Sequence, residues 1–286
     1  MRKKLALAVA VACACVGAAA PAYAQHSAAP KVVGLTGDGT LVTFRADAPA
    51  QTSRLGRITG LTGDTKVVGI DFRVQDRKLY AVGDKGGVYT VGGDAKAKKV
   101  SQLTVALNGA DFGVDFNPAA NRLRVISDTG QNLRHNIDDP AGAPAAGTTA
   151  TDGTLTNPPV PPATTGATAT GVSGAGYTNN DLNPATATTL FDLDTTADQV
   201  SVQSPANAGN LAPTGKLGVD ATGGAGFDVF STLRDGVTVS NTAYATLKVG
   251  NGYRFHSVDL LTGAAVQIGA FPRNRQVVDI AVQLAG

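Results

Sequence analysis

An internal repeat of 44 residues constrains the fold of this chain more than any other feature. The segment Gly69-Ile70-Asp71-Phe72 returns as Gly113-Val114-Asp115-Phe116. In both copies two further strand-like runs follow, separated by turns rich in glycine, aspartate and asparagine. Repeats of about 40 to 50 residues that contain several strands are typical of β-propellers. Each repeat would then be one blade of four strands, and the segment with the aspartate would be its first strand.

The two ends of the chain complete this pattern. Weaker copies of the repeat begin at Ser173 and at Gly226, and the chain ends on residues 277–282, which match a first strand with nothing after it. Residues 31–60 offer three strand-like runs that lack a first strand. Pairing the two ends in one blade would close the ring and remove exposed sheet edges. We therefore expect an all-β, closed β-propeller of five four-stranded blades over residues 32–286, with the N- and C-terminal strands sharing one blade.

The composition agrees with short strands and tight turns. All 22 acidic residues are aspartate, and 35 residues are glycine. Glutamate is a good helix former, whereas aspartate and glycine favour turns. Beyond the first residues, no stretch shows a sustained helical period.

The first 24 residues have the pattern of a secretory signal peptide. Arg2, Lys3 and Lys4 precede an apolar run over residues 5–20, and Ala22-Tyr23-Ala24 supplies small residues for cleavage before Gln25. The run is shorter than the roughly 20 residues of a membrane span. We expect residues 25–31 to be a linker and the protein to be secreted or periplasmic, not membrane-embedded.

Cleavage there would change the charge and the redox chemistry of the chain. Both cysteines, Cys13 and Cys15, would leave, so disulfides are excluded. Of 24 Lys and Arg residues the signal holds three, which leaves 21 against 22 aspartates. A nearly neutral chain argues against nucleic acid or an anionic membrane as partner.

A proline- and threonine-rich insertion interrupts the repeats at residues 139–170. Six prolines stand in this segment, and proline cannot join the ladder of a central strand. We expect a surface loop around one short strand near Gly153-Thr154-Leu155. The preferred interpretation is a connector, and the alternative is an arm over one face of the ring.

Several blocks of the chain resemble a family of exported bacterial proteins that is defined as a domain of unknown function. The blocks are the run from Ala110 to Pro118, the run Arg122-Leu123-Arg124-Val125-Ile126-Ser127-Asp128-Thr129-Gly130-Gln131-Asn132-Leu133-Arg134, and later segments around Tyr177, Leu190 and Leu217. The resemblance spans about residues 32 to 283. It implies a propeller-like export domain and carries over no catalytic residue.

Four aspartates, Asp71, Asp115, Asp228 and Asp279, recur in first strands, which line the central channel of a propeller. Such carboxylates could bind a hard cation such as Ca²⁺, and the sequence indicates no other cofactor. The preferred interpretation is architectural: each side chain accepts backbone N–H groups and fixes its blade to a neighbour. The spaced residues Asp192, Asp194, Thr196 and Asp198 lack the glycine and glutamate of a calcium loop and are interpreted as a polar turn.

A second group of polar residues follows the second strand of two blades. It comprises Asp84, Lys85, Asp128, Thr129, Gln131 and Asn132. Turns at this place share one rim with the entry to the first strand. Asp128, Gln131 and Asn132 are therefore candidate ligand-binding residues for a polar ligand, a glycan or a protein. The preferred interpretation is turn chemistry alone.

No motif in the chain specifies a reaction. His135 and His256 each stand three residues before an aspartate, which favours a blade position over a catalytic base. Ser173 lacks the context of a nucleophile elbow, and no phosphate-binding loop occurs. The leading hypothesis is an exported non-enzymatic binding or scaffolding module. The alternatives are a metal-assisted hydrolase or lactonase that uses the axial aspartates, and a structural surface or matrix protein.

Overall fold

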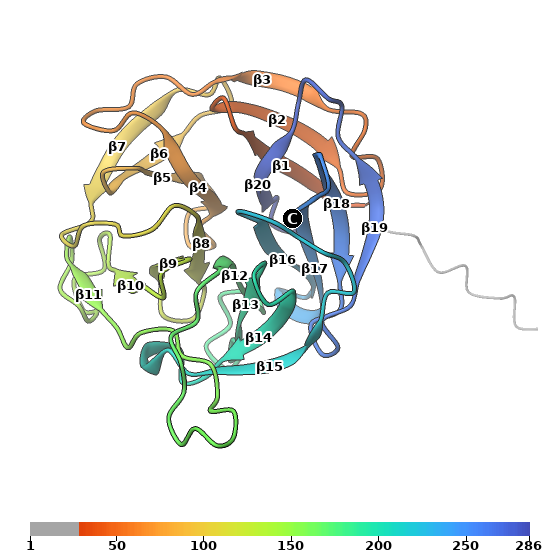
Figure 1. Ribbon diagram of the computed structural model, residues 1–286. Coiled ribbons are helices and arrows are strands. Elements are labelled where there is room, and N and C mark those ends of the chain that lie inside the picture. Colours follow the sequence, from red (N-terminus) through yellow and green to blue (C-terminus); the bar gives the residue numbers. More distant parts are fainter. Residues whose placement is uncertain (1–28) are drawn as a thin grey trace, which may run out of the picture.

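A computed structural model of the protein describes residues 29–286, and these form a ring of five four-stranded antiparallel sheets (Figure 1). The predicted signal peptide and most of the predicted linker lie outside the described residues. Within residues 29–286 the one helical element is a short 3₁₀ turn, η1 (Ala206–Ala208). No helix in this part of the chain has the length and apolar character needed to cross a membrane.

The blades follow one another along the chain, each from an inner to an outer strand. The second blade has strands β4 (Val67–Phe72), β5 (Leu79–Gly83), β6 (Gly87–Val91) and β7 (Ala97–Gln102). The third has β8 (Phe112–Asn117), β9 (Arg122–Ser127), β10 (Asn132–His135) and β11 (Thr149–Thr151). The fourth has β12 (Val172–Tyr177), β13 (Leu190–Asp194), β14 (Gln199–Gln203) and β15 (Leu211–Lys216). The fifth has β16 (Gly226–Arg234), β17 (Val237–Val249), β18 (Gly252–Val258) and β19 (Ala265–Ala270).

The first blade is built from both ends of the chain. Its order is β20 (Val277–Val282), β1 (Lys31–Thr36), β2 (Thr40–Arg45) and β3 (Ser53–Arg57). Strands β20 and β1 are antiparallel, with Val33 opposite Ala281. The predicted five blades and the predicted closure by the two ends are both confirmed.

Glycine recurs in the inner strands because the backbone of the next blade lies too close for a side chain. A Cβ on Gly113 would lie 2.7 Å from the backbone nitrogen of Ala175, and one on Gly226 would lie 2.6 Å from the Cα atom of Asp279. No neighbour can move away from such a contact without moving its strand. The glycine that stands two residues before Asp71, Asp115 and Asp228 therefore sets how tightly the inner strands pack around the axis.

The hydrophobic core lies between the blades. Tyr80 and Val82 of the second blade pack with Phe116, Leu123 and Val125 of the third in one buried cluster. The outermost strands are exposed, so a hydrophobic pattern does not mark them. We expected the fourth strand of the second blade at residues 100–107, but β7 begins at Ala97, and its Lys98 and Lys99 face solvent.

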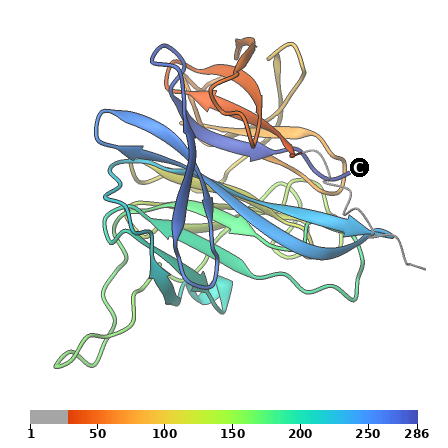
Figure 2. The same cartoon turned by 90° about the vertical axis from the view of Figure 1, so that its right-hand side faces the viewer.

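The proline-rich insertion supplies the outer strand of the third blade. That strand, β11, lies at Thr149–Thr151, a few residues before the predicted Gly153-Thr154-Leu155. Leu155 is instead fully buried between the third and fourth blades. The following segment, green in Figures 1 and 2, projects away from the ring, and Val160 in it is 75% exposed. The segment therefore does not cover the axis.

Candidate ligand site at the axial mouth

The axial aspartates of four inner strands each join their strand to the next one around the ring. The carboxylate of Asp71 accepts a hydrogen bond of 2.8 Å from the backbone amide of Phe116, and that of Asp279 accepts one of 2.8 Å from Ile70. Asp228 accepts from the amide of Val282 in the same way.

The backbone amide of Tyr177 is the corresponding donor to Asp115. In each of the four cases, one residue of the neighbouring inner strand lies level with the aspartate, and the next residue of that strand is the donor. The architectural role is therefore visible in the geometry of the strands.

The four aspartates do not lie at one level of the channel. Gly226 packs on Asp279 and Ile280 as Gly113 packs on Gly174 and Ala175. Asp279 is thus level with the repeated glycines, two residues nearer the strand start than the other three aspartates. Ala281 occupies the position that corresponds to Asp71.

The other three aspartates form a compact buried cluster. One carboxylate oxygen from each of Asp71, Asp115 and Asp228 lies within 4.8 Å of the others. Burial raises the pKa of Asp228 to about 7, against its ordinary 3.8. Burial, together with repulsion from neighbouring carboxylates, raises the pKa of Asp71 and of Asp115 well above the ordinary value. The cluster can reduce its mutual repulsion by holding protons or by holding a cation.

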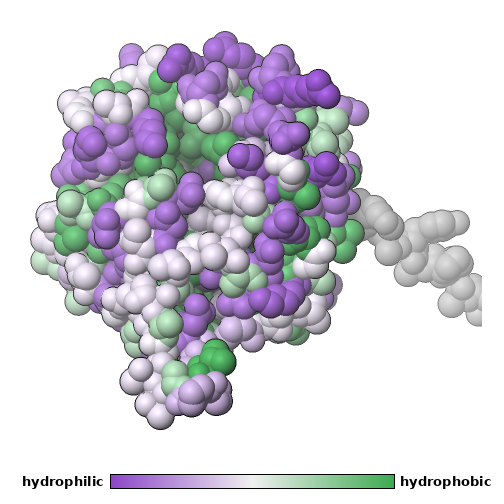
Figure 3. Space-filling model, in the orientation of Figure 1, coloured by the Kyte–Doolittle hydropathy of each residue, from purple (hydrophilic) through white to green (hydrophobic). Residues whose placement is uncertain are grey.

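A cavity of about 360 Å³ opens on the axis at the face where the inner strands begin. Its apolar walls come from four of the five blades: Leu35 and Ile58, Val67 and Val68, Phe112, Ala225 and Val278. Figure 3 shows this face hollowed, with hydrophobic side chains inside the hollow and hydrophilic ones around it. Asp279 lies at the inner side of the cavity, and burial raises the pKa of its carboxyl to about 8.

A long connection crosses the mouth of the channel. The segment between β15 and β16, cyan in Figure 1, passes over the axis and brings Gly224 to Asp111 at the start of β8. The backbone amide of Gly224 donates a hydrogen bond to the Asp111 carboxylate. A Cβ on Gly224 would lie 2.6 Å from Oδ1 of Asp111, so a larger residue here would displace the Asp111 carboxylate.

The mouth carries charges of both signs beside an aromatic hydroxyl. Lys66 and Arg57 supply positive charge, Asp111 and Asp38 supply negative charge, and Tyr253 adds a phenol. Burial and repulsion by Asp128 raise the pKa of Asp111, and Lys66 partly offsets this rise. Burial and the nearby Asp111 raise the pKa of Tyr253, which keeps its hydroxyl protonated as a donor.

A smaller cavity of about 260 Å³ adjoins the mouth on the other side of the crossing segment. Asp111 and Gly223–224 separate the two spaces, and Asp128, Ser173 and Thr195 line the smaller one. Thr195 fixes the crossing segment by a hydrogen bond of 2.6 Å to the carbonyl of Gly223. Asp128 is thus placed at the rim, next to a space that a ligand could enter.

The side chains of the rim residues form hydrogen bonds to the segments that lead into the inner strands. Asp84 accepts hydrogen bonds from the backbone amides of Thr65 and Lys66. Burial alone would raise the pKa of Asp84, but these hydrogen bonds outweigh it and lower the pKa to about 2. The Gln131 side chain accepts a hydrogen bond of 2.9 Å from the backbone amide of Asn108 and donates one of 2.8 Å to the backbone carbonyl of Ala106. Asp128 accepts from the amide of Ala110 at 2.9 Å.

Asn132 lies away from the rim, inside the ring. It is 1% exposed, donates to the carbonyls of Gly153 and Ala206, and accepts from the buried Arg124 at 2.7 Å. All of its side-chain hydrogen bonds are made within the interface of the third and fourth blades. The structure therefore places it in the framework, apart from either cavity.

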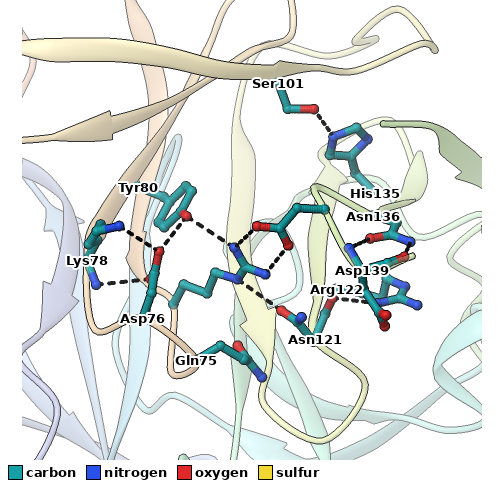
Figure 4. Close-up of polar contacts among 12 residues, drawn as sticks. Gln75, Asp76, Lys78, Tyr80, Ser101, Asn121, Arg122, His135, Asn136 and Asp139 are labelled. Carbon is teal, nitrogen blue, oxygen red and sulfur yellow. Dashed lines mark hydrogen bonds and ion pairs between the residues drawn. The ribbon is translucent and has the colours of Figure 1, made fainter. Parts of the chain in front are cut away.

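The two histidines lie in the third strands of their blades, as expected. His135 points with Nε2 at the hydroxyl of Ser101, 2.8 Å away (Figure 4), and with Nδ1 at that of Thr149, 3.0 Å away. Burial lowers the pKa of His135 to about 4, so its ring is neutral at physiological pH. Neither His135 nor His256 lines the axial mouth or the smaller cavity beside it.

The predicted polar turn after β13 is also present. Asp194 accepts hydrogen bonds of 2.8 Å from the amides of Thr196 and Ala197, which closes the turn. Asp192 is buried, and neither of its carboxylate oxygens has a hydrogen-bond partner among residues 29–286. Burial raises the pKa of the Asp192 carboxyl well above its ordinary value, and the positive charge of Arg124 partly offsets this rise.

The ring of five blades with a cavity at its axis defines a five-bladed β-propeller. A family model described as "Domain of unknown function (DUF4394)" matches residues 40–281, so the chain belongs to that family. No curated protein matches the chain.

Two solved structures with some similarity are both remote. An auxiliary nutrient binding protein from Bacteroides thetaiotaomicron VPI-5482 is 11% identical, with a TM-score of 0.45, over 88% of this chain and 61% of that one. A protein of unknown function from the same organism is also 11% identical, with a TM-score of 0.43, over 91% of this chain and 68% of that one. The chain thus spans less than two thirds of the length of the first of these proteins.

Proposed function

We propose that this protein is a non-enzymatic binding module that takes a small, uncharged polar ligand, such as a mono- or disaccharide, in the axial mouth. The observation that carries the proposal is the mouth itself. A concave space of about 360 Å³ offers apolar walls together with Lys66, Asp111 and the Tyr253 hydroxyl. Ligand sites of this size commonly combine apolar walls with a few placed polar groups. Sugar hydroxyls both donate and accept, and so can satisfy charges of both signs.

Binding is favoured over catalysis by what the carboxylates already do. Asp71, Asp228 and Asp279 accept backbone amides of neighbouring strands, and Asp111 accepts the amide of Gly224. A carboxylate that holds the framework in this way is poorly placed to move during a reaction. The same bonds would keep the mouth in one shape, which supports the binding of a ligand without loss of order in the protein.

A metal-assisted hydrolase or lactonase is the second candidate, and the cluster of Asp71, Asp115 and Asp228 is the observation that favours it. Three carboxylate oxygens within 4.8 Å of one another have the ligand type that Ca²⁺ prefers. The residues fit a hard cation in chemistry, and such an ion could polarise a bound carbonyl or water. Wild-type protein that melts at the same temperature with and without Ca²⁺ would exclude this candidate.

We further propose that the protein is exported, with cleavage before Gln25. The support is the charged start, the apolar run and the Ala22-Tyr23-Ala24 sequence. N-terminal sequencing of material from the medium or the periplasm should begin at Gln25. Retention of the first 24 residues would contradict the proposal.

The ligand can be sought by a thermal-shift screen and a glycan array with the wild-type protein. Asp111→Asn and Lys66→Met should each weaken binding of a hit about tenfold, because each removes one charge-assisted hydrogen bond at the mouth. Lys85→Met is the matched control, since Lys85 stands on the same face but does not line the cavity. Equal binding by all three variants would place the ligand elsewhere.

A further inference from the structure

A second large cavity lies between the first and second blades, on the face opposite the axial mouth. Its volume is about 480 Å³. It is lined at the end of β4 by Phe72, at the end of β6 by Val91, and at the start of β1 by Lys31 and Val33. The axial mouth is lined by strand starts of β4 and β20, so the two cavities are separate and open on different faces.

The wall of this inter-blade cavity is apolar. Val33, Leu79 and Val91 are buried members of the hydrophobic cluster between the two blades, and Leu55 and Phe72 are partly buried against it. The cavity therefore exposes a part of the inter-blade core. A ligand that covers Leu55 and Phe72 would gain the free energy of removing apolar surface from water.

The rim of the same cavity is cationic. Five basic side chains line it, and no aspartate does: Lys31, Arg77, Lys78, Lys96 and Lys98. The chain as a whole has nearly equal numbers of acidic and basic residues, so the excess is local. Clusters of like charge beside a low-dielectric wall attract an opposite charge.

Three of the five cations are available to a ligand. Lys78 pairs with Asp76 at 3.4 Å, and Arg77 donates to the backbone carbonyls of Leu284 and Ala285. Within residues 29–286, Lys31, Lys96 and Lys98 form no ion pair. All three are exposed, and their long side chains can lie along the apolar wall with the ammonium group at its edge.

We propose that the inter-blade cavity binds a small anionic amphiphile, with its apolar chain against Leu55 and Phe72 and its carboxylate head among Lys31, Lys96 and Lys98. The cavity complements both parts of such a ligand at once, with an apolar wall for the chain and three unpaired lysines for the head. A concave space of about 480 Å³ falls in the range of small-molecule sites. The site is independent of the ligand proposed for the axial mouth.

Dodecanoate below its micelle concentration is the probe for this site, with isothermal titration calorimetry as the measurement. Octaethylene glycol monododecyl ether has the same chain with an uncharged head that is not a sugar, and acetate has the head without the chain. We expect dodecanoate to bind at least about tenfold more tightly than either, because each comparison compound lacks one of the two complementary parts. Equal affinity for dodecanoate and the uncharged dodecyl ether, or no binding of dodecanoate, would overturn the proposal.

The double variant Lys96→Gln/Lys98→Gln should weaken the binding of dodecanoate about tenfold and leave that of the uncharged dodecyl ether unchanged. Lys99→Gln is the matched control, because Lys99 neighbours Lys98 on β7 but does not line the cavity. Lys66→Met at the axial mouth should also leave dodecanoate binding unchanged. Equal losses in the double variant and the Lys99 control would show a diffuse charge effect and contradict a defined site.

A bilayer with anionic head groups is the other source of the same chemistry. Vesicles of neutral lipid with about one fifth phosphatidylglycerol test it by co-sedimentation at low salt. If the cavity binds single molecules, monomeric dodecanoate should bind whether or not the protein also binds vesicles. Vesicle binding that needs Lys96 and Lys98, in the absence of any binding of monomeric dodecanoate, would replace the cavity ligand with a membrane surface and overturn the proposal.

Discussion

Asp71 joins the second blade to the third through one hydrogen bond, from the backbone amide of Phe116 to its carboxylate at 2.8 Å. The other oxygen of the same carboxylate accepts the amide of Phe72 in its own strand. The same arrangement recurs at Asp228, with Val282 and Val229 as donors. The repeated aspartate is therefore a connection between inner strands, and its place at the axis follows from that role.

Replacing these aspartates one at a time separates this role from cation binding. In Asp115→Asn and Asp228→Asn one acceptor oxygen remains and the volume hardly changes. Each variant should lose about 1 kcal/mol of unfolding free energy, the usual net contribution of one hydrogen bond. Urea denaturation with and without Ca²⁺ measures this. A wild-type melting temperature that rises with Ca²⁺, and does not rise in the variants, would instead assign the cluster to an ion.

The pH dependence of stability should report the axial carboxyls whose pKa is raised. The pKa values of Asp228 and Asp279 are raised to about 7 and about 8, against 3.8 in an unfolded chain. Between pH 3.8 and these raised values the folded protein binds more protons than the unfolded chain. The contribution of these two groups to stability is therefore greatest at low pH and is lost as pH rises through about 8. We expect the unfolding free energy to fall from about pH 6.5 to about pH 8.5.

Asp279→Asn is the variant that tests this dependence, because it removes one titrating group. The fall in unfolding free energy above pH 6.5 should be smaller in it than in the wild type. His135 does not interfere, since its pKa is about 4 when folded and 6.5 ordinarily. Asp47→Asn, at an exposed carboxylate with a lowered pKa, should keep the wild-type slope. An unchanged slope in Asp279→Asn would show that Asp279 is ionised throughout this range.

Removing β20 should prevent folding of the ring. Deletion of residues 277–286 takes away the inner strand of the first blade, whose amides and carbonyls pair with β1 from Val32 to Thr36. It also removes Asp279 and the amide of Val282, and so breaks the connections to the second and fifth blades. We expect loss of folded protein, whereas deletion of Ala285 and Gly286 alone should be mild. Circular dichroism of both truncations decides this, and an unchanged melting curve without β20 would contradict the closure.

Arg73 and Asp138 form an ion pair that bridges the second and third blades. The Arg73 side chain is 6% exposed and also donates to Asn121 and to the Tyr80 hydroxyl, whereas Asp138 is 59% exposed. Arg73→Met should lose about 2 kcal/mol of unfolding free energy, because it leaves Oδ1 of Asn121 and the buried Tyr80 hydroxyl without this donor. Asp138→Asn should lose less than about 1 kcal/mol, as exposed ion pairs do. Equal losses in urea denaturation would contradict this ranking.

The ring was predictable because the chain repeats its inner strand and divides one blade between its two ends. The level of Asp279 was not predictable, for a physical reason. Side chains alternate along a strand, so a shift of two residues keeps every side chain on the same face. Val278-Asp279-Ile280-Ala281 therefore matches the repeat with Asp279 at either the aspartate or the glycine position, and the contact of Gly226 with Asp279 decides between them.

The residues of the mouth were missed because they do not repeat. Asp111, Lys66 and Tyr253 stand far apart in the sequence and come together when three blades meet at the axis. One signal was available: Asp111 lies 44 residues after Val67, so a charged residue replaces an apolar one at this position of the repeat. A departure from the repeat, and not the repeated aspartate, marks the candidate ligand site.

Hydrogen exchange of the protein with and without a saturating screening hit tests the proposed site most directly. A ligand in the axial mouth should slow exchange in three separate segments, residues 65–68, 110–112 and 223–225, because these surround the cavity and their backbone would be covered or made rigid. The inter-blade cavity, at residues 90–98, should be unaffected by the same ligand. Slower exchange confined to residues outside these three segments would show that the ligand binds elsewhere and would contradict the account.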